Sequence, residues 1–379
     1  MENSKSVPSF DIKLQTENIR AELLEVAARV IDSGAYILGP EVNVFEQEFA
    51  AATQSRHAIS CASGSDALLL ALMALDIGPG DEVCLPSFTY YATASCVKRV
   101  GATPVFIDCD STYNMSIEDL EQRLSPNTKA IIPVHLFGQM LDMKRLQSWV
   151  AGIPQKVHMI EDCAQSMGAS FSGRHCGTWG DIGTFSFYPT KNLGGLGDGG
   201  MMTVQSAEIN DRLRILRVHG EKKKYFHDVL GINSRLDALQ AAFLRVKLRH
   251  LDSYERARAA IADRYLKAFE AANIFDFITL PIVLDDRKHV WNQFTIRVKN
   301  REQLISHLVE DKIGTNIYYP LPQHLQKTFA YLGYKRGDLY MSEKLAGEVL
   351  SLPMYPEMPL ENVDRVVDSI RSFYRLAQA

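Results

Sequence analysis

The sequence predicts an α/β protein with a mostly parallel sheet, helices on both faces of that sheet, and a smaller C-terminal α+β domain. Three observations predict this fold class. Strand and helix patterns alternate between residues 57 and 205, one long helical pattern covers 234–272, and isolated strands and helices follow residue 273. A chain of 379 residues has room for two or three domains of about 100–200 residues each. We predict a large domain over residues 1–250, with an N-terminal segment, and a small domain over 251–379.

The first half of the chain contains the alternating elements of the predicted sheet. The strand patterns cover residues 57–62, 82–86, 103–108, 130–135 and 157–161. The helix patterns between them cover residues 66–75, 92–100, 117–124 and 143–150. Each strand pattern is short and apolar nearly throughout, which is typical of a strand buried on both faces of a parallel sheet. Because ligands of such sheets bind beyond the carboxyl ends of the strands, we expect the functional residues there.

The second half begins with the long helical pattern and then changes. Apolar residues near a 3.6-residue repeat support a helix over residues 234–272, and they are Leu236, Leu239, Ala242, Phe243, Val246 and Leu251. The patterns that follow predict a strand over 290–298, a helix over 301–310, a short strand over 317–319 and a final helix over 360–376. Proline-containing loops at 320–322 and 353–359 separate these elements, as in a small α+β domain.

Composition and charge exclude several classes of function. Hydrophobic residues make up 46% and charged residues 23% of the chain, which is ordinary globular usage. A net charge of -4 and a pI of about 6.2 leave no basic excess for non-specific nucleic-acid binding. The longest apolar run, 67–75, is far shorter than the roughly 18–20 residues of a membrane span. The N-terminus lacks an apolar signal core, and the six cysteines form no C-x-x-C pair. We therefore expect a cytoplasmic protein with reduced thiols and no nucleic-acid or membrane partner.

The first motif at a strand end is Ser63-Gly64-Ser65-Asp66, between a strand and a helix. Free N–H groups at a helix N-terminus attract phosphate, and glycine lets the anion approach the backbone. The alternative is an ordinary strand–helix turn capped by Ser65 or Asp66. The Asp66 carboxylate would repel a phosphate unless it points away.

The second motif, Glu161-Asp162-Cys163-Ala164-Gln165-Ser166, follows the strand pattern that begins at residue 157. An acidic residue at this strand end has three candidate roles: a metal ligand, a helix cap, or the partner of a cationic ring nitrogen. We expect no metal, because no cluster of histidines or acids with metal-ligand spacing surrounds this motif.

The third motif places Lys191 at the start of a glycine-rich loop, with five glycines in the next nine positions. Such glycines let a backbone wrap closely around a ligand. A partly buried lysine loses basicity and can attack a carbonyl as an amine, whereas a lysine on a surface loop is usually only a solvated charge. The order of residues excludes a P-loop, in which the lysine follows the glycines. A fourth motif, with Asn233 and Ser234 as candidate caps, precedes the long helix.

Taken together, these motifs resemble those of the DegT/StrS family of nucleotide-sugar aminotransferases, which are pyridoxal-phosphate enzymes of fold type I. The resemblance extends from about residue 34 to the C-terminal region. Its most specific parts are residues 161–165, 186–200 and 233–239. It implies an aspartate-aminotransferase-like fold with pyridoxal 5'-phosphate as the cofactor.

The resemblance also implies a role for each matching residue. Lys191 would bind the cofactor covalently and serve as the catalytic base and acid, and Asp162 would pair with the protonated pyridine nitrogen. Gln165 would hydrogen-bond the phenolic oxygen of the cofactor, and Tyr90 would stack on its ring, unless Tyr90 is only a core aromatic. The phosphate would be held by a further group of residues, Gly64, Ser65, Ser186 and, from the neighbouring subunit, Asn233. A homodimer with shared active sites follows from the last of these roles.

The implied reaction transfers an amino group from glutamate to a nucleotide-linked keto sugar. The segment around 223–237 is most similar to enzymes that aminate C3 of dTDP-3-keto-6-deoxyhexoses for glycan or antibiotic biosynthesis. The alternatives are amination at C4 of a UDP- or dTDP-4-keto sugar, a sugar dehydratase on the same fold, and a non-catalytic regulatory protein. The dehydratases have histidine in place of Lys191, and a Rossmann dehydrogenase would need a G-x-G-x-x-G motif that the first strand lacks.

Five residues are candidates for substrate binding: Tyr188, Lys223, His227, Tyr318 and Tyr319. Lysines near residue 223 could bind a diphosphate from across a dimer interface, or form only a solvated face. Similar 3-aminotransferases usually have histidine where Tyr318 stands. We expect Tyr318 to orient the sugar without moving a proton, since the phenol pKa near 10 makes tyrosine a poor base at neutral pH. The alternative for the tyrosines is packing between the domains.

Overall fold

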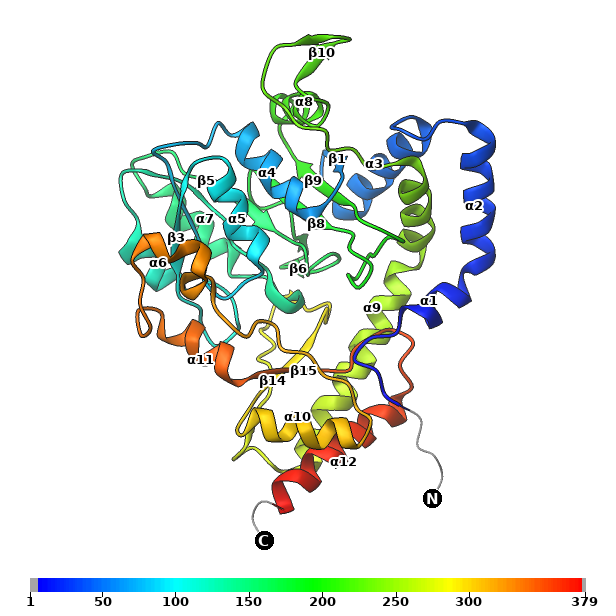
Figure 1. The fold of residues 1–379 in the computed structure, drawn as a ribbon, viewed down its shortest axis with the longest axis vertical. Helices are drawn as coiled ribbons and strands as arrows, with labels where there is room; N and C mark the ends of the chain where they lie inside the picture. The colour runs from blue at the N-terminus through cyan, green and yellow to red at the C-terminus, as the bar shows by residue number, and fades with distance from the viewer. Residues whose placement is uncertain (1–5, 377–379) are drawn as a thin grey trace.

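The computed structural model describes residues 6–376 and has an α/β architecture (Figure 1). Residues 1–5 and 377–379, which end the two predicted domains, lie outside the described residues. The α-helices are α1 Ile12–Asn18, α2 Arg20–Ser33, α3 Pro40–Thr53, α4 Gly64–Ala74, α5 Tyr91–Arg99, α6 Ile117–Arg123, α7 Met143–Ala151, α8 Ala207–Leu216, α9 Ala238–Ala272, α10 Arg301–Glu310, α11 Tyr340–Glu348 and α12 Leu360–Leu376. The strands are β1 His57–Cys61, β2 Glu82–Pro86, β3 Thr103–Ile107, β4 Thr128–Ile131, β5 His158–Asp162, β6 Ser170–Phe171, β7 Arg174–His175, β8 Ile182–Ser186, β9 Gly200–Val204, β10 Glu221–Lys223, β11 Phe226–His227, β12 Ile278–Thr279, β13 Arg287–Lys288, β14 Phe294–Val298 and β15 Val349–Leu352. Three 3-10 helices complete the order: η1 Leu136–Gly138, η2 Gln323–Leu325 and η3 Lys327–Leu332.

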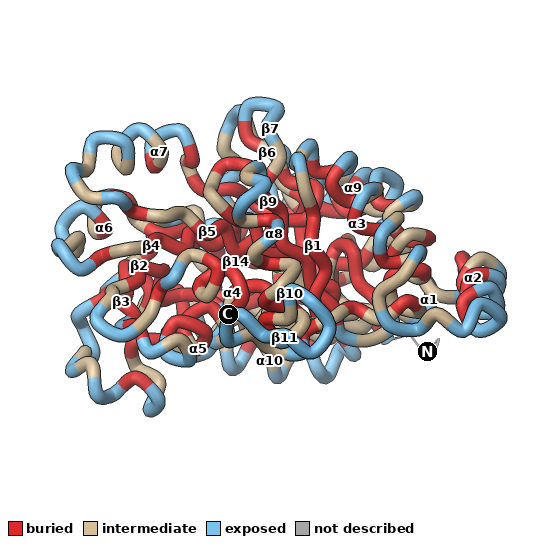
Figure 2. Tube along the Cα trace, turned by 90° about the horizontal axis from the view of Figure 1, so that it is seen from above, coloured by how far each residue is buried: buried red, intermediate tan, exposed pale blue. Residues whose placement is uncertain are grey.

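The central sheet has seven strands in the order β1-β9-β8-β5-β4-β2-β3. β9 is antiparallel to both of its neighbours, and the remaining neighbouring pairs are parallel. These strands form the buried interior, with helices outside them (Figure 2). The mostly parallel sheet flanked by helices confirms the predicted fold class. It also brings the carboxyl ends of β1, β2, β4, β5 and β8 to one edge.

The five predicted strands of the first half are β1 to β5, and the four predicted helices are α4 to α7. The end of β4 differs from the prediction, because this strand stops at Ile131 rather than at residue 135. Pro133 follows and has no N–H to donate to a neighbouring strand. Beyond it, the His135 N–H donates to the Asp162 carbonyl at 3.1 Å, which aligns the two strand ends.

Two further predictions in the second half were wrong in extent or type. β14 begins at Phe294 rather than at residue 290, because Trp291 has a left-handed backbone conformation with φ of 49°. Residues 317–319 form no strand, and Asn316 beside them forms an isolated bridge with Ser351. Both tyrosines of this segment instead line a cavity at the edge of the central sheet.

The long helix α9 connects the two halves of the molecule (Figure 1). Its first part packs against α2, and this cluster consists of Ile19, Leu23, Val26, Val30, Ala238, Ala242 and Val246. Its last part joins the core of the small domain, around the sheet β12-β14-β15 and the helices α10 and α12. The division at residue 250 stays a prediction, and α9 is continuous across it. Within the described residues, no helix is both long and apolar enough to span a lipid bilayer.

A two-stranded hairpin, β10–β11, projects from the body of the molecule beyond α8 (Figure 1). It carries strongly exposed apolar side chains, including Tyr225 at 79% and Phe226 at 60% exposure, and Leu230 follows it at 88%. Apolar exposure of this kind marks a surface that binds another protein or ligand.

Candidate active site

A cavity of about 580 Å³ lies at the carboxyl edge of the central sheet. Ten of the predicted site residues line it, and they are Gly64, Ser65, Tyr90, Asp162, Gln165, Ser186, Tyr188, Lys191, Tyr318 and Tyr319. Two of them begin α4, six come from strand ends or the loops that follow, and the last two come from the segment after α10. The topology thus brings together residues that are far apart in sequence, as expected for the ligand edge of a parallel sheet.

Lys191 lies in the glycine-rich loop between β8 and β9 and is half-buried. Its N–H donates to the Tyr188 carbonyl at 2.9 Å, which begins a tight turn. Only glycine fits at position 194, since a Cβ there would lie 2.3 Å from the Pro189 carbonyl oxygen. Burial lowers the pKa of Lys191 to about 8, and the nearby Asp162 carboxylate partly opposes this shift. The lowered pKa leaves a larger fraction of this amine unprotonated near neutral pH than an exposed lysine would have, as an amine nucleophile requires.

Asp162 ends β5 and is 5% exposed. Its carboxylate accepts hydrogen bonds from the Thr93 hydroxyl at 2.9 Å and from the Ala164 N–H at 3.1 Å. Burial raises the pKa of this carboxyl group, although these hydrogen bonds and the charge of Lys191 act in the opposite direction. A buried carboxylate of this kind is stabilised by a cationic group placed against it. Sequence reasoning missed Thr93, because a threonine within a helix gives no local signal of its partner.

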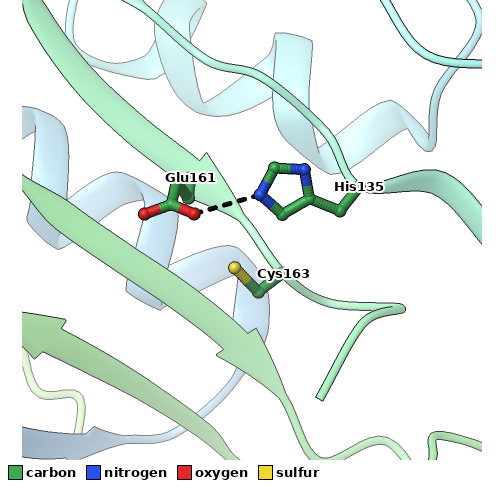
Figure 3. A group of neighbouring side chains, drawn as sticks. All are labelled: His135, Glu161 and Cys163. Carbon is green, nitrogen blue, oxygen red and sulfur yellow. Dashed lines mark hydrogen bonds and ion pairs between the residues drawn. The ribbon is translucent and has the colours of Figure 1, made fainter. Parts of the chain in front are cut away.

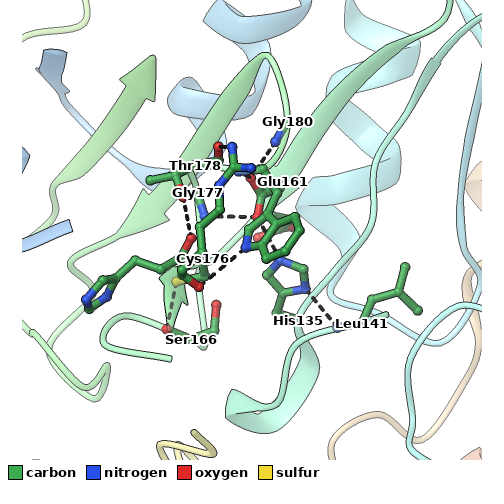
Figure 4. A network of polar contacts seen from close by, with 12 residues as sticks. His135, Leu141, Glu161, Ser166, Cys176, Gly177, Thr178 and Gly180 are labelled. Atoms are coloured by element: carbon green, nitrogen blue, oxygen red, sulfur yellow. Dashed lines mark hydrogen bonds and ion pairs between the residues drawn. The ribbon is translucent and has the colours of Figure 1, made fainter. Parts of the chain in front are cut away.

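A hydrogen-bonded network holds the strand end that carries Asp162 (Figures 3 and 4). The fully buried Glu161 accepts from His135 Nε2 at 3.0 Å and from the Gly177 N–H at 2.9 Å through one oxygen. Its other oxygen accepts from the Trp179 and Gly180 N–H groups, both at 2.7 Å. This carboxylate therefore ties β5 to the loop over residues 177–180.

This network includes a group of side chains that could in principle bind a metal ion. One potential ligand atom each from His135, Glu161 and Cys163 lies within 4.8 Å of the others (Figure 3). The Leu141 N–H donates to His135 Nδ1 at 3.3 Å, so the ring carries its proton on Nε2 and donates it to Glu161. Both Glu161 oxygens have two donors each. Burial raises the pKa of Cys163 well above its ordinary value, which keeps it a thiol. Hydrogen bonds within the protein thus occupy His135 and Glu161, and Cys163 stays protonated. The cluster therefore supports the strand end that carries Asp162.

The N-terminus of α4 faces the same cavity. Ser63 caps this helix by accepting the Asp66 N–H at 3.1 Å. A Cβ at Gly64 would lie 2.6 Å from Ser186 Cβ, so only glycine lets the start of α4 approach the end of β8 this closely. The Asp66 carboxylate accepts the Ser234 hydroxyl at 2.7 Å. This bond fixes the Asp66 carboxylate against Ser234.

Aromatic side chains form the remaining wall of the cavity. Tyr90 is 58% exposed, which rules out a core aromatic, and its ring centroid lies 6.0 Å from that of Tyr319. The Tyr319 hydroxyl accepts from Gln165 Nε2 at 3.0 Å, and Gln165 Oε1 accepts from the Phe137 N–H at 2.9 Å. Burial raises the pKa of both Tyr318 and Tyr319, so both remain neutral phenols at physiological pH.

Three predicted residues lie outside this cavity. Asn233 forms an isolated bridge with Val218. Lys223 and His227 lie on the β10–β11 hairpin, where Lys223 Nζ is 5.3 Å from the Phe226 ring centroid. His227 Nδ1 is 3.0 Å from the His219 carbonyl oxygen. The cavity of one chain is therefore assembled without these residues.

The side chains of this cavity fit pyridoxal phosphate. The ligand needs a lysine of lowered basicity, a buried carboxylate opposite a cationic ring nitrogen, and an anion site. Lys191 and Asp162 meet the first two needs. The N-terminus of α4, with Gly64 against Ser186, meets the third.

Comparison with known proteins gives consistent results. The model of the DegT/DnrJ/EryC1/StrS aminotransferase family matches residues 17–371. The chain is 46% identical to a "Pleiotropic regulatory protein" of Geobacillus stearothermophilus, over 98% of this chain and 99% of that protein. It is 43% identical to the UDP-N-acetyl-3-dehydro-alpha-D-glucosamine 3-aminotransferase of Acidithiobacillus ferrooxidans, over 98% and 99% of the two chains. It is also 44% identical to the dTDP-3-amino-3,6-dideoxy-alpha-D-galactopyranose transaminase of Aneurinibacillus thermoaerophilus, over 97% and 99%.

Among solved structures, the chain is similar to S. venezuelae DesV in complex with a ketimine intermediate. The TM-score is 0.94 at 42% identity, and the match covers 98% of this chain and 99% of that chain. Similarity therefore extends over nearly the whole chain, including the residues that line the cavity. With its family match over residues 17–371, the chain belongs to the DegT/DnrJ/EryC1/StrS aminotransferase family.

Proposed function

We propose that this chain is a pyridoxal-phosphate-dependent aminotransferase that moves an amino group from glutamate to a nucleotide-linked keto sugar. The main observation behind the proposal is that Lys191 and Asp162 line the same cavity, next to the N-terminus of α4. The acceptor position that we propose is C3 of a dTDP-3-keto-6-deoxyhexose. Relatives that transfer amino groups at C3 of sugars support this position.

The protein's own residues have distinct tasks in this reaction. When bound, pyridoxal phosphate would supply an electron sink for the carbon that gains or loses a proton. Asp162 would keep a positive charge on the ring nitrogen, and Gln165 would hold the phenolic oxygen. Lys191 takes and returns the proton at its Nζ atom, which its pKa of about 8 permits near neutral pH. Tyr90 would limit the movement of the ring and exclude water from one side.

Replacing Lys191 with alanine tests the assignment of the catalytic residue. We expect the Lys191→Ala variant to lose turnover and the absorption band of the lysine-bound cofactor. A variant that keeps this band would overturn the assignment. Lys267→Ala is a matched control, because Lys267 is exposed on α9 outside the cavity and its loss should leave turnover and the band unchanged.

A panel assay tests the substrate. Purified enzyme with glutamate is presented with dTDP- and UDP-linked 3-keto and 4-keto sugars, and each product is identified by mass and by the position of its amino group. We expect the highest kcat/KM with the dTDP-3-keto sugar. A preference for a 4-keto sugar would contradict amination at C3 and would show that the enzyme aminates C4 instead.

Two other activities remain to be distinguished from an aminotransferase. A dehydratase of this fold is disfavoured by Lys191, which stands where those enzymes have histidine. A regulatory role is suggested by the name of the Geobacillus stearothermophilus relative. We propose that the chain is catalytic, because Lys191, Asp162 and Gln165 all line the cavity. A yellow purified protein whose colour glutamate bleaches would support this, and a colour unaffected by any amino acid would contradict it.

We also propose a cytoplasmic homodimer with shared active sites. The exposed hairpin with Tyr225, Phe226 and the adjoining Leu230 offers an apolar surface to a second copy of the chain. Asn233, Lys223 and His227 lie on or near this hairpin and could complete the partner's cavity. The six cysteines are all buried free thiols, which is consistent with a reducing compartment.

A further inference from the structure

A buried contact joins two segments that both border the active-site cavity. One is the 87–90 segment, which follows β2 and ends at Tyr90. The other is the 318–324 segment, which begins with Tyr318 and Tyr319. Both segments present tyrosines to the cavity, which Thr89 also lines, whereas the other residues of the contact do not line it. We call this set of residues, Ser87, Thr89, Gln323, His324 and Glu343, the 87–324 contact.

The first half of the 87–324 contact is made by Gln323, which is 2% exposed. Its N–H donates to the Ser87 carbonyl at 2.8 Å. Its side-chain Nε2 donates to the Thr89 carbonyl at 2.8 Å. These two bonds fix the backbone immediately before Tyr90 to the backbone four residues after Tyr319.

The second half is a chain of three polar side chains. Ser87 Oγ lies 2.7 Å from His324 Nδ1, and His324 Nε2 lies 3.2 Å from Glu343 Oε1. The His324 N–H also donates to Ser87 Oγ at 3.2 Å. The hydroxyl proton of Ser87 is therefore directed to Nδ1, and the ring donates its Nε2 proton to Glu343. This assignment satisfies all three side chains with a neutral imidazole.

The burial of this chain excludes hydrolytic chemistry. Ser87 is fully buried and His324 is 1% exposed, so no substrate can reach the serine oxygen. Burial also lowers the pKa of His324, although Glu343 acts in the opposite direction. The 87–324 contact is thus built to hold two segments together rather than to react.

We propose that Ser87, Gln323 and His324 are positioning residues that hold Tyr318 and Tyr319 at a set distance from Tyr90. This inference rests on the proposed function, because it assigns the tyrosines to sugar binding. Tyr318 and Tyr319 follow a small-domain helix, whereas Tyr90 belongs to the large domain. The width of the cavity between them therefore depends on the contacts that join these two segments, and the 87–324 contact fixes their backbones to each other.

The test compares the two halves of the reaction in variants of the 87–324 contact. His324→Leu removes both side-chain bonds of the imidazole, and His324→Asn keeps an acceptor for the Ser87 hydroxyl. Gln323→Met removes only the side-chain bond to the Thr89 carbonyl. The control is His307→Leu, because His307 also lies near a serine hydroxyl, Ser372 Oγ at 3.2 Å, but lies away from the cavity between α10 and α12. Cofactor absorbance measures the glutamate stage, and product formation measures KM and kcat for the nucleotide sugar.

We expect His324→Leu to raise the sugar KM by about tenfold or more while the glutamate stage changes by less than about twofold, because misplaced binding groups weaken only the stage that uses them. His324→Asn should retain a lower KM than His324→Leu, and the His307 control should resemble the wild type. If His324→Leu does not fold, Gln323→Met carries the same expectation.

Two results would overturn the inference. One is an unchanged sugar KM in the His324 or Gln323 variants, and the other is an equal loss in both stages. Failure of the proposed function is a different result, since it requires that the wild-type enzyme itself aminates no keto sugar of the panel.

Discussion

At the scale of single residues, Lys191 carries a cost for stability as well as a catalytic task. Burial lowers its pKa from the unfolded value of 10.5 to about 8 in the folded protein. Between these pH values the unfolded chain binds more protons, so the stability contributed by this group rises with pH. Below pH 8 the folded state bears the full cost of a buried ammonium group. The active site is therefore maintained at the expense of folding free energy.

This cost predicts the behaviour of an apolar variant. Without cofactor, Lys191→Met should unfold at a higher temperature than the wild type at pH 7. The difference should shrink as the pH approaches 10.5, where the lysine is neutral in both states. Thermal unfolding of the two cofactor-free proteins across this range measures the effect. A constant difference at every pH would show that packing rather than ionisation causes it.

A second prediction at this scale concerns Tyr318. Tyr318→Phe should raise the sugar KM and leave the glutamate half-reaction largely intact, because the phenol would orient the sugar and the first stage needs no hexose. Tyr331→Phe is the control, since Tyr331 is 54% exposed on η3 and does not line the cavity. Comparable losses in both half-reactions would show that Tyr318 supports the cofactor or the fold instead.

At the scale of secondary-structure elements, α5 supports the carboxylate of β5. Thr93 lies in the first turn of α5 and donates to Asp162 at 2.9 Å. Thr93→Val keeps the shape of the side chain but removes this bond, and a hydrogen bond to a charged group contributes about 1.5–3 kcal/mol. We therefore expect cofactor affinity to fall by about tenfold or more. Ser95→Ala in the same helix removes only a local bond to the Ala92 carbonyl and should change nothing in a cofactor titration.

Element-scale features also show what the sequence could predict. The strands β1 to β5 were recognisable because burial on both faces makes a short run apolar throughout. Lys191 and Asp162 were recognisable by the motifs around them. Thr93, Glu161 and His324 carry no such local signal, because each acts through a partner that is distant in sequence. The strand predicted over 317–319 was wrong because an apolar, aromatic run does not reveal that it lines a cavity.

At the scale of the whole molecule, the proposed dimer gives a test that needs no structure of the complex. If Asn233 acts in the partner's cavity, Lys191→Ala and Asn233→Ala subunits should each be weakly active alone. Co-expressed, they would form mixed dimers with one intact site, and random pairing should restore about a quarter of the wild-type activity. Activity no greater than that of the single variants would place Asn233 in the cavity of its own chain, or outside catalysis altogether.

The continuity of α9 has a mechanical consequence. Its 35 residues span about 52 Å at 1.5 Å per residue, and they include no glycine or proline at which a helix readily bends. The proposed boundary at residue 250 falls inside this helix, so rotating one domain against the other would require bending or breaking it. Entry and exit of a large substrate must then depend on smaller movements, in the loops at the sheet edge and in the projecting hairpin. An enzyme built on such a rigid axis can exchange its ligands while the two domains keep their orientation.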